Sequence, residues 1–182
     1  MRWLIANIND FSDEDFDKVL SFASDSRKRH FLSFKREEVR KRSIVGEILI
    51  KRILKESYSL ETSIECDKNG KPYIENSELY ISISHSFDMV FAAVSEKPIG
   101  VDIERIKDIN FSVAKKFAND EELEYIGSDL KRFYEIWTAK EAYYKMTGGS
   151  AVNFKSFSVF SLQREIVLNK DYFAQIVTKR EG

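Results

Sequence analysis

The sequence predicts an α+β fold of two pseudo-symmetric lobes, each with helices packed on a small antiparallel sheet. Three observations favour this class. Helical patterns lie beside groups of short strand patterns, a helix-rich stretch leads into paired strands in each half, and no linker separates the halves. A chain of 182 residues suits one domain or two small lobes. We therefore expect lobes at residues 1–98 and 99–182, packed together as one functional unit.

The N-terminal half begins with the pattern of one strand and two helices. Residues 3–8 alternate and are apolar enough for a strand. Ser12 is a favourable N-cap, and the acidic residues after it suit a first helical turn. Apolar residues then recur at helical spacing from Phe16 to Ala23, which predicts one amphipathic helix. A longer helix is predicted from about residue 35 to residue 56.

Short strand patterns follow the second predicted helix. Residues 64–67 and 72–74 flank a Lys-Asn-Gly-Lys segment, and Asn-Gly is a strong signal for a hairpin turn. Residues 79–84 alternate, residues 89–94 form a continuous apolar run, and residues 99–105 are a further strand candidate. This grouping predicts antiparallel pairing in the N-terminal lobe.

The C-terminal half is predicted to hold two helices and then strands. Asn119 and Glu122 form a suitable cap pair for the first helix. A long amphipathic helix is predicted over residues 129–146, and two consecutive glycines follow it as a stop signal. The tail, residues 154–177, has the pattern of two or three strands.

Composition and charge exclude several classes of protein. The chain carries 29 Lys and Arg against 30 Asp and Glu, so it lacks a general electrostatic footprint for nucleic acid. Its 43% hydrophobic content excludes disordered and collagen-like classes. The single cysteine, Cys66, cannot form an intrachain disulfide or a cysteine zinc cluster. Because no apolar run is long enough for a membrane span, we expect a cytoplasmic protein without membrane or nucleic-acid partners.

The segment Gly-Val-Asp-Ile-Glu at residues 100–104 is the first candidate for chemistry. Side chains alternate along a strand, so Asp102 and Glu104 share one face while Val101 and Ile103 share the other. Two carboxylates about 7 Å apart at their Cα atoms can converge on one cation, and Mg²⁺ prefers such oxygen ligands. The alternative is the solvated face of an amphipathic strand.

The segment Trp-Thr-Ala-Lys-Glu-Ala-Tyr-Tyr-Lys at residues 137–145 is the second candidate. On a helix, Glu141 and Lys145 lie one turn apart on the same face. A common exposed ion pair, stabilising the helix by about 0.2–0.5 kcal/mol, explains this spacing equally well. The functional alternative is a site where the carboxylate of Glu141 and the amines of Lys140 and Lys145 meet a metal and a phosphate.

Other catalytic signatures are missing, and charge is unevenly distributed. The sequence has no G-x-S-x-G, P-loop, G-x-G-x-x-G or H-E-x-x-H motif. His85 lies at the end of a strand pattern and by itself indicates no function. Residues 25–56 contain eleven Lys and Arg against five Asp and Glu. Such a stretch is usually a solvated helix face, but it also attracts polyanionic ligands or acidic partner proteins.

Taken together, the motifs resemble those of 4'-phosphopantetheinyl transferases of the surfactin-synthetase-activating, two-lobe type. Their order and spacing fit this family, and the resemblance extends from about residue 22 to residue 159. The last two segments are highly specific as a pair. The matching segments are Gly70-Lys71-Pro72, Ser84-His85-Ser86, Gly100-Val101-Asp102-Ile103-Glu104 and Trp137-Thr138-Ala139-Lys140-Glu141-Ala142-Tyr143-Tyr144-Lys145.

The resemblance implies an enzyme that moves the 4'-phosphopantetheine arm of coenzyme A to a serine of an acyl- or peptidyl-carrier protein, releasing adenosine 3',5'-bisphosphate. Asp102, Glu104 and Glu141 would hold Mg²⁺, or Mn²⁺ in its place, against the coenzyme A pyrophosphate. Glu141 would also take the serine proton, and Lys145 and Lys140 would neutralise the leaving group. We expect Glu141 to be ionised, because nearby positive charge lowers the pKa of a carboxyl group.

By resemblance, coenzyme A would lie in the cleft between the lobes, with its nucleotide end on the N-terminal lobe and the metal site on the C-terminal lobe. Arg27 and His30 fall near positions where the family often has lysines. Arg27 keeps the full positive charge at its position, whereas His30 is only partly charged at neutral pH. The resemblance also implies a monomer. The residues expected to contact the nucleotide end are Arg42, Lys71, Ser84 and His85.

Two other functions stay open on the sequence alone. A Mg²⁺-dependent phosphohydrolase acting on a nucleotide would use water as the acceptor. A non-catalytic module that binds coenzyme A would keep the fold without turnover, although it would not need Asp102, Glu104, Glu141 and Lys145 together.

Overall fold

The computed structural model describes residues 1–67, 71–149 and 152–179. The chain divides into two compact units, Met1–Lys97 (unit 1) and Pro98–Gly182 (unit 2). The sequence predicted a boundary at residues 98/99. Within the described ranges, no helix has both the length and the apolar character that crossing a membrane requires.

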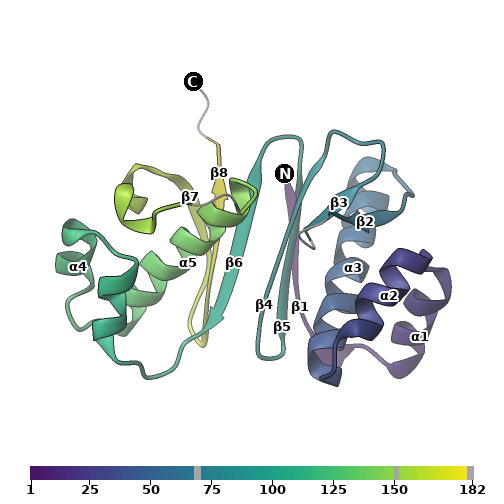
Figure 1. Ribbon diagram of the computed structural model, residues 1–182, viewed down its shortest axis with the longest axis horizontal. Coiled ribbons are helices and arrows are strands. Elements are labelled where there is room, and N and C mark those ends of the chain that lie inside the picture. Colours follow the sequence, from purple (N-terminus) through teal and green to yellow (C-terminus); the bar gives the residue numbers. More distant parts are fainter. Residues whose placement is uncertain (68–70, 150–151, 180–182) are drawn as a thin grey trace. The chain divides into compact units, whose positions relative to one another are not determined.

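Unit 1 is built on a three-stranded antiparallel sheet with strand order β1-β5-β4, and helix α3 packs against it (Figure 1). The central strand is buried from Val90 to Ser95, which explains its continuous apolar run. The apolar face of α3, including Ile44, Leu49 and Ile53, completes the core with this strand. The elements are β1 (Arg2–Asn7), α3 (Glu37–Tyr58), β4 (Tyr80–Ser86) and β5 (Met89–Ser95).

Smaller elements surround this sheet and helix. Ser12 caps α1 through a capping box with Asp15, as the sequence predicted for Ser12. Helix α2 was not predicted, because its inward face carries a buried Arg27 beside Phe31 instead of an apolar stripe. These elements are a short 3₁₀ turn (Ile8–Asp10), α1 (Asp13–Phe22), α2 (Asp25–Ser33), β2 (Ile64–Cys66) and β3 (Pro72–Ile74), the last two paired antiparallel.

Unit 2 repeats the arrangement with strand order β6-β8-β7 and helix α5 packed on the sheet. The strand predicted over residues 99–105 is confirmed as β6. The predicted tail is correct for two strands, but its first part forms 3₁₀ turns. The elements are β6 (Ile99–Arg105), a 3₁₀ turn (Phe111–Lys116), α4 (Asp120–Ile126), α5 (Leu130–Met146), two 3₁₀ turns (Phe154–Ser156 and Val159–Ser161), β7 (Gln163–Asn169) and β8 (Tyr172–Thr178).

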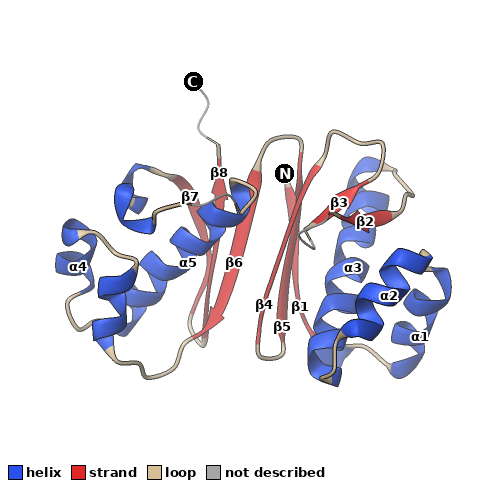
Figure 2. Ribbon diagram, in the orientation of Figure 1, coloured by secondary structure: helices blue, strands red, loops and turns tan. Residues whose placement is uncertain are grey.

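The two units share one topology, which confirms the predicted pseudo-symmetric α+β fold. In each sheet the first strand in sequence lies at one edge, the last strand lies in the centre, and the strand before it forms the other edge. A long helix, α3 or α5, comes after the first strand and before the closing pair in both units. Figure 2 shows the helices of each unit on one face of its own sheet.

Candidate functional site

A close approach between β6 and α5 positions the candidate site of unit 2. A Cβ atom added at Gly100 would lie 1.7 Å from the carbonyl oxygen of Ala142 and 2.7 Å from the backbone nitrogen of Met146. Only glycine leaves room for the helix backbone here. The glycine of the first motif therefore brings the strand that carries Asp102 against the helix that carries the second motif.

Asp102 and Lys145 join the two motifs directly. The Nζ atom of Lys145 donates to the Oδ1 atom of Asp102 at 2.7 Å. The Asp102 side chain is 4% exposed and the Lys145 side chain 28%. Asp102 lies opposite Gln175 of β8, and the Nε2 atom of Gln175 donates to the Glu135 carbonyl oxygen of α5, so this face of the sheet looks toward the helix. The carboxylate of Asp102 is thus held on the side of the sheet that faces the helix.

Glu141 belongs to the same electrostatic cluster. Burial raises the pKa of Glu141, the negative charges of Asp102 and Glu104 raise this pKa further, and the Lys145 ammonium opposes them. The expectation of an ionised Glu141 refers to a site that also holds a metal ion; without a cation, burial and the two carboxylates outweigh the one lysine and raise this pKa. The direction of the shift indicates that the carboxylates of Asp102 and Glu104 lie near enough to act on Glu141.

The donor set suits a hard divalent cation. Glu141 and the two carboxylates that act on it offer oxygen ligands to an ion, and a cation bound among them would relieve the repulsion at Glu141. Among the described residues, no group of three His, Cys, Asp or Glu side chains already has the arrangement of a metal site. The Asp102–Lys145 ion pair would have to open, or be shared, for a cation to bind.

Lys140 has a different place from the one the sequence predicted. It is fully buried and its Nζ atom contacts Glu122 Oε1 at 2.8 Å and the carbonyl oxygens of Phe154 and Phe157 at 2.5 and 2.7 Å. These contacts use the three N–H donors of the ammonium group. We therefore remove Lys140 from the candidate site: its geometry is that of a structural ion pair in the interior of unit 2.

In unit 1, His85, which was predicted to contact the nucleotide end, lines a cavity of about 230 Å³ together with Arg27 and His30. No Asp or Glu is found among the described residues that line it. Burial, and next the charge of Arg27, lower the pKa of His30 against the opposing effect of Glu47. The cavity therefore combines a permanent cation with two imidazoles, a donor set that suits an anionic group.

The other predicted residues of unit 1 lie in different surroundings. Ser84 is buried and, because side chains alternate along β4, it lies on the face opposite His85, so it does not line this cavity with His85. Arg42 donates from Nη1 to the Phe87 carbonyl oxygen at 2.6 Å, and its buried Nε atom has no hydrogen-bond partner among the described residues. Lys71 is exposed, and its backbone N–H donates to Asp67.

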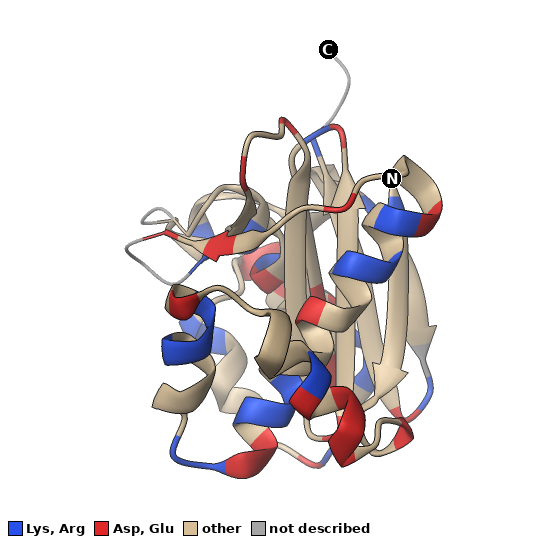
Figure 3. Ribbon diagram, turned by 90° about the vertical axis from the view of Figure 1, so that its right-hand side faces the viewer, with Lys and Arg blue, Asp and Glu red and all other residues tan. Residues whose placement is uncertain are grey.

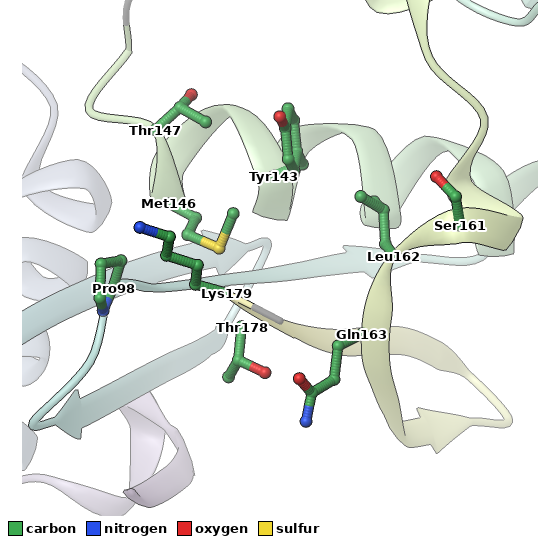
Figure 4. Close-up of a pocket in the computed structure, with 9 residues that line it drawn as sticks. All are labelled: Pro98, Tyr143, Met146, Thr147, Ser161, Leu162, Gln163, Thr178 and Lys179. Carbon is green, nitrogen blue, oxygen red and sulfur yellow. The ribbon is translucent and has the colours of Figure 1, made fainter. Parts of the chain in front are cut away.

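Another hollow, of about 430 Å³, lies beside the C-terminal part of α5 (Figure 4). Tyr143 and Met146 form one wall, and Leu162, Thr178 and Lys179 are among the residues that form the rest. Tyr143 lies about 200° around the helix from Glu141. This hollow therefore opens on another face of α5 and does not contain the carboxylate cluster.

Comparisons with known proteins agree with the motifs. Residues 98–175 match the family model described as the 4'-phosphopantetheinyl transferase superfamily. The chain is 30% identical over 179 residues to the 4'-phosphopantetheinyl transferase gsp of Aneurinibacillus migulanus, covering 93% of this chain and 75% of that protein. It is 32% identical to the 4'-phosphopantetheinyl transferase ffp of Bacillus subtilis and 30% identical to the 4'-phosphopantetheinyl transferase Sfp of Bacillus subtilis strain 168, in both cases over 81% of this chain and 70% of the relative.

Proposed function

We propose, from the premise that this chain belongs to the 4'-phosphopantetheinyl transferase superfamily, that it transfers 4'-phosphopantetheine from coenzyme A to a serine of an acyl- or peptidyl-carrier protein. The other product would be adenosine 3',5'-bisphosphate. The matches confirm the predicted resemblance and enzyme class. The observation that carries the proposal is the cluster of Asp102, Glu104, Glu141 and Lys145, assembled from two motifs.

Asp102, Glu104 and Glu141 are the residues that would hold Mg²⁺, with Mn²⁺ as the other candidate. A divalent ion bound there would supply positive charge to the pyrophosphate oxygens of coenzyme A as a Lewis acid. Lys145 adds an ammonium group at the same place, and it would neutralise the charge that develops on the leaving phosphate. Phosphoryl transfer needs positioning and charge stabilisation above all, and these side chains provide both.

Glu141 is the residue we propose as the base. Its carboxylate would accept the proton of the carrier serine hydroxyl, directly or through one water. The serine oxygen would then form a bond to the phosphorus that carries the pantetheine arm, while the bond from this phosphorus to the nucleotide bisphosphate breaks. The raised pKa of Glu141 belongs to the protein without a cation, and a divalent ion at this cluster would lower it and keep the carboxylate ionised, the state that a general base needs.

The cavity of unit 1 supports a place for the anionic nucleotide end of coenzyme A. Arg27, His30 and His85 line it without an acidic residue among its described lining. Arg42 does not line this cavity, but its buried Nε atom lacks a hydrogen-bond partner in the described chain, and a bound ligand could supply one. Lys71 is retained in the proposal from the family motif alone.

The partner we propose is an acidic carrier protein. The helices of unit 1 carry many of the Lys and Arg residues of the stretch 25–56, shown in blue in Figure 3 with acidic residues among them. A local positive potential of this kind speeds the encounter with an acidic protein even when the net charge of the chain is −1.

Chromatography of the nucleotide products tests the proposal against both rivals. With coenzyme A, Mg²⁺ and an apo carrier protein, the transferase releases adenosine 3',5'-bisphosphate, and without the carrier it releases almost none. A phosphohydrolase cleaves coenzyme A at the same rate in both reactions. A non-catalytic module leaves coenzyme A intact in both. Either of the last two results, obtained with several carriers, overturns the proposal.

A further inference from the structure

A buried ion pair connects helices α2 and α3 of unit 1, and its arginine lines the cavity of about 230 Å³ that also contains His30 and His85. The Nε atom of Arg27, on α2, lies 2.9 Å from the Oε2 atom of Glu47, on α3, and the two side chains are 5% and 1% exposed. The Oε1 atom of Glu47 lies 2.9 Å from the Nζ atom of Lys51, one helical turn further along α3. The arginine guanidinium also lies over the Phe31 ring, 4.6 Å from its centroid.

This pair is poorly explained by fold stability. Taking two charges out of water costs several kcal/mol per ion, and apolar residues of similar volume often stabilise a fold as well or better. Arg27 is also placed where its charge has a use, because it lines the cavity that contains His30 and His85. Two of its five N–H groups serve Glu47 and the Sγ atom of Cys66, and no further hydrogen bond of its side chain is found within the described chain. The remaining N–H groups are available to a ligand.

We propose that Glu47 is a positioning residue that fixes the guanidinium of Arg27 for a phosphate group at the nucleotide end of coenzyme A. This inference rests on the proposed function and adds a residue that no motif indicated. The role is geometric: a carboxylate near an anion site opposes binding by its charge, so it helps only by holding the arginine in one orientation. The Phe31 ring and the contact with Cys66 hold the same guanidinium from other sides.

The test compares coenzyme A with 3'-dephospho-coenzyme A as substrates for the transfer to an apo carrier. The second compound lacks the 3'-phosphate and keeps the pyrophosphate at which the reaction takes place. We expect Arg27→Met to raise the KM for coenzyme A about tenfold or more, the effect of losing a hydrogen bond to a charged group. The KM for the dephospho compound and the kcat values for both compounds should stay within about twofold of the wild-type values. A contact that binds the substrate and the transition state equally well affects KM and leaves kcat unchanged.

Glu47→Leu should reduce the preference for coenzyme A over 3'-dephospho-coenzyme A as much as Arg27→Met does. The conservative Glu47→Gln should retain part of this preference. In the Arg27→Met background, Glu47→Leu should not raise the KM for coenzyme A any further, since the positioning effect of Glu47 requires Arg27. The double variant is also expected to fold if the single Glu47→Leu variant does not, because it replaces the whole pair by apolar side chains. Lys51→Met is the matched control: it removes the other partner of Glu47 and should keep the preference.

Three results would contradict these expectations. If Glu47→Leu lowers the melting temperature but keeps the preference for coenzyme A, the pair is structural and the inference is wrong. An additive effect of Glu47→Leu in the Arg27→Met background overturns it as well. A wild-type chain that transfers nothing from either compound overturns the proposed function, which the first two results leave intact.

Discussion

Two lysines on one helix show how burial assigns different roles to similar residues. Lys145 lies at the edge of the carboxylate cluster and contacts Asp102. Lys140 is enclosed, and its pKa is lowered by burial despite the opposing effect of Glu122. The two positions differ by about 140° around α5. The sequence could not separate them, because the carbonyl oxygens that enclose Lys140 come from residues 154 and 157, well beyond the helix.

The first prediction concerns this buried pair. Lys140→Met should lower the free energy of unfolding of unit 2 by about 3–5 kcal/mol, because it leaves the carboxylate of Glu122 buried without its counter-charge. Replacing Glu122 by Gln in the same chain should recover a large part of this loss. Urea unfolding measures both, with Lys131→Met on the exposed side of α5 as the control. A loss below about 1 kcal/mol would show that the pair behaves as a surface contact.

A second prediction follows from His30, whose pKa is lowered by burial and by Arg27. The native protein then binds fewer protons here than the unfolded chain. The contribution of His30 to stability is therefore complete at neutral pH and is lost as the pH falls below about 6.5, the ordinary pKa of histidine.

Melting temperatures measured between pH 7.5 and pH 5 check this sign. The wild-type curve should fall more steeply with acidification than the curve of a His30→Asn variant, because the variant has no imidazole to protonate. If the two curves run parallel, the surroundings of His30 do not disfavour its charged form.

At the scale of elements, the packing of β6 on α5 determines the site. The strand brings Asp102 and Glu104, the helix brings Glu141 and Lys145, and Gly100 allows the two backbones to approach. The site therefore depends on one glycine that touches no substrate in our account.

The third prediction tests this dependence. Gly100→Ala should destabilise unit 2 by about 3 kcal/mol or more and reduce transferase activity, because the new Cβ meets backbone atoms that cannot move aside. Gly46→Ala in α3 is the matched control, since its Cβ would meet side-chain atoms of Ile83 at 3.0 Å and not backbone atoms, and alanine favours a helix. Calorimetry of both variants compares them. Equal melting temperatures would contradict the close approach.

The elements also show what sequence patterns can and cannot predict. The pattern at β6 predicted its bounds and the shared face of Asp102 and Glu104, because alternation alone fixes which side chains lie together. Helix α2 escaped prediction because Arg27 occupies a position where an apolar residue would mark the buried face. Glu47 gave no signal at all, since its partner lies on another helix, 20 residues earlier in the chain.

At the scale of the whole molecule, charge distribution matters more than net charge. The fourth prediction is that reversing the charge of Arg36 and Arg40 raises the KM for an acidic carrier protein and leaves the KM for coenzyme A unchanged. Lys41 belongs to the same stretch, but it already pairs with Asp13 and Glu37, so its reversal should have a smaller effect. The difference in carrier KM between the wild type and the Arg36 and Arg40 variant should shrink at high salt, where the attraction between the basic stretch and an acidic carrier is screened. Lys131→Glu in unit 2 is the control, because it reverses a charge outside this stretch. If the carrier KM of the Arg36 and Arg40 variant is unchanged, the stretch is not part of the docking surface.

The central claim is that the cluster of unit 2 catalyses transfer to a carrier serine, and the mass of the carrier tests it most directly. We would incubate an apo carrier protein with this chain, coenzyme A and Mg²⁺ and record its intact mass. The account predicts a gain of one phosphopantetheine arm, lost with EDTA, with Asp102→Ala and with Glu141→Gln, while each variant stays folded. A full gain with Glu141→Gln or Asp102→Ala, or no gain on any carrier despite binding of coenzyme A, would contradict it.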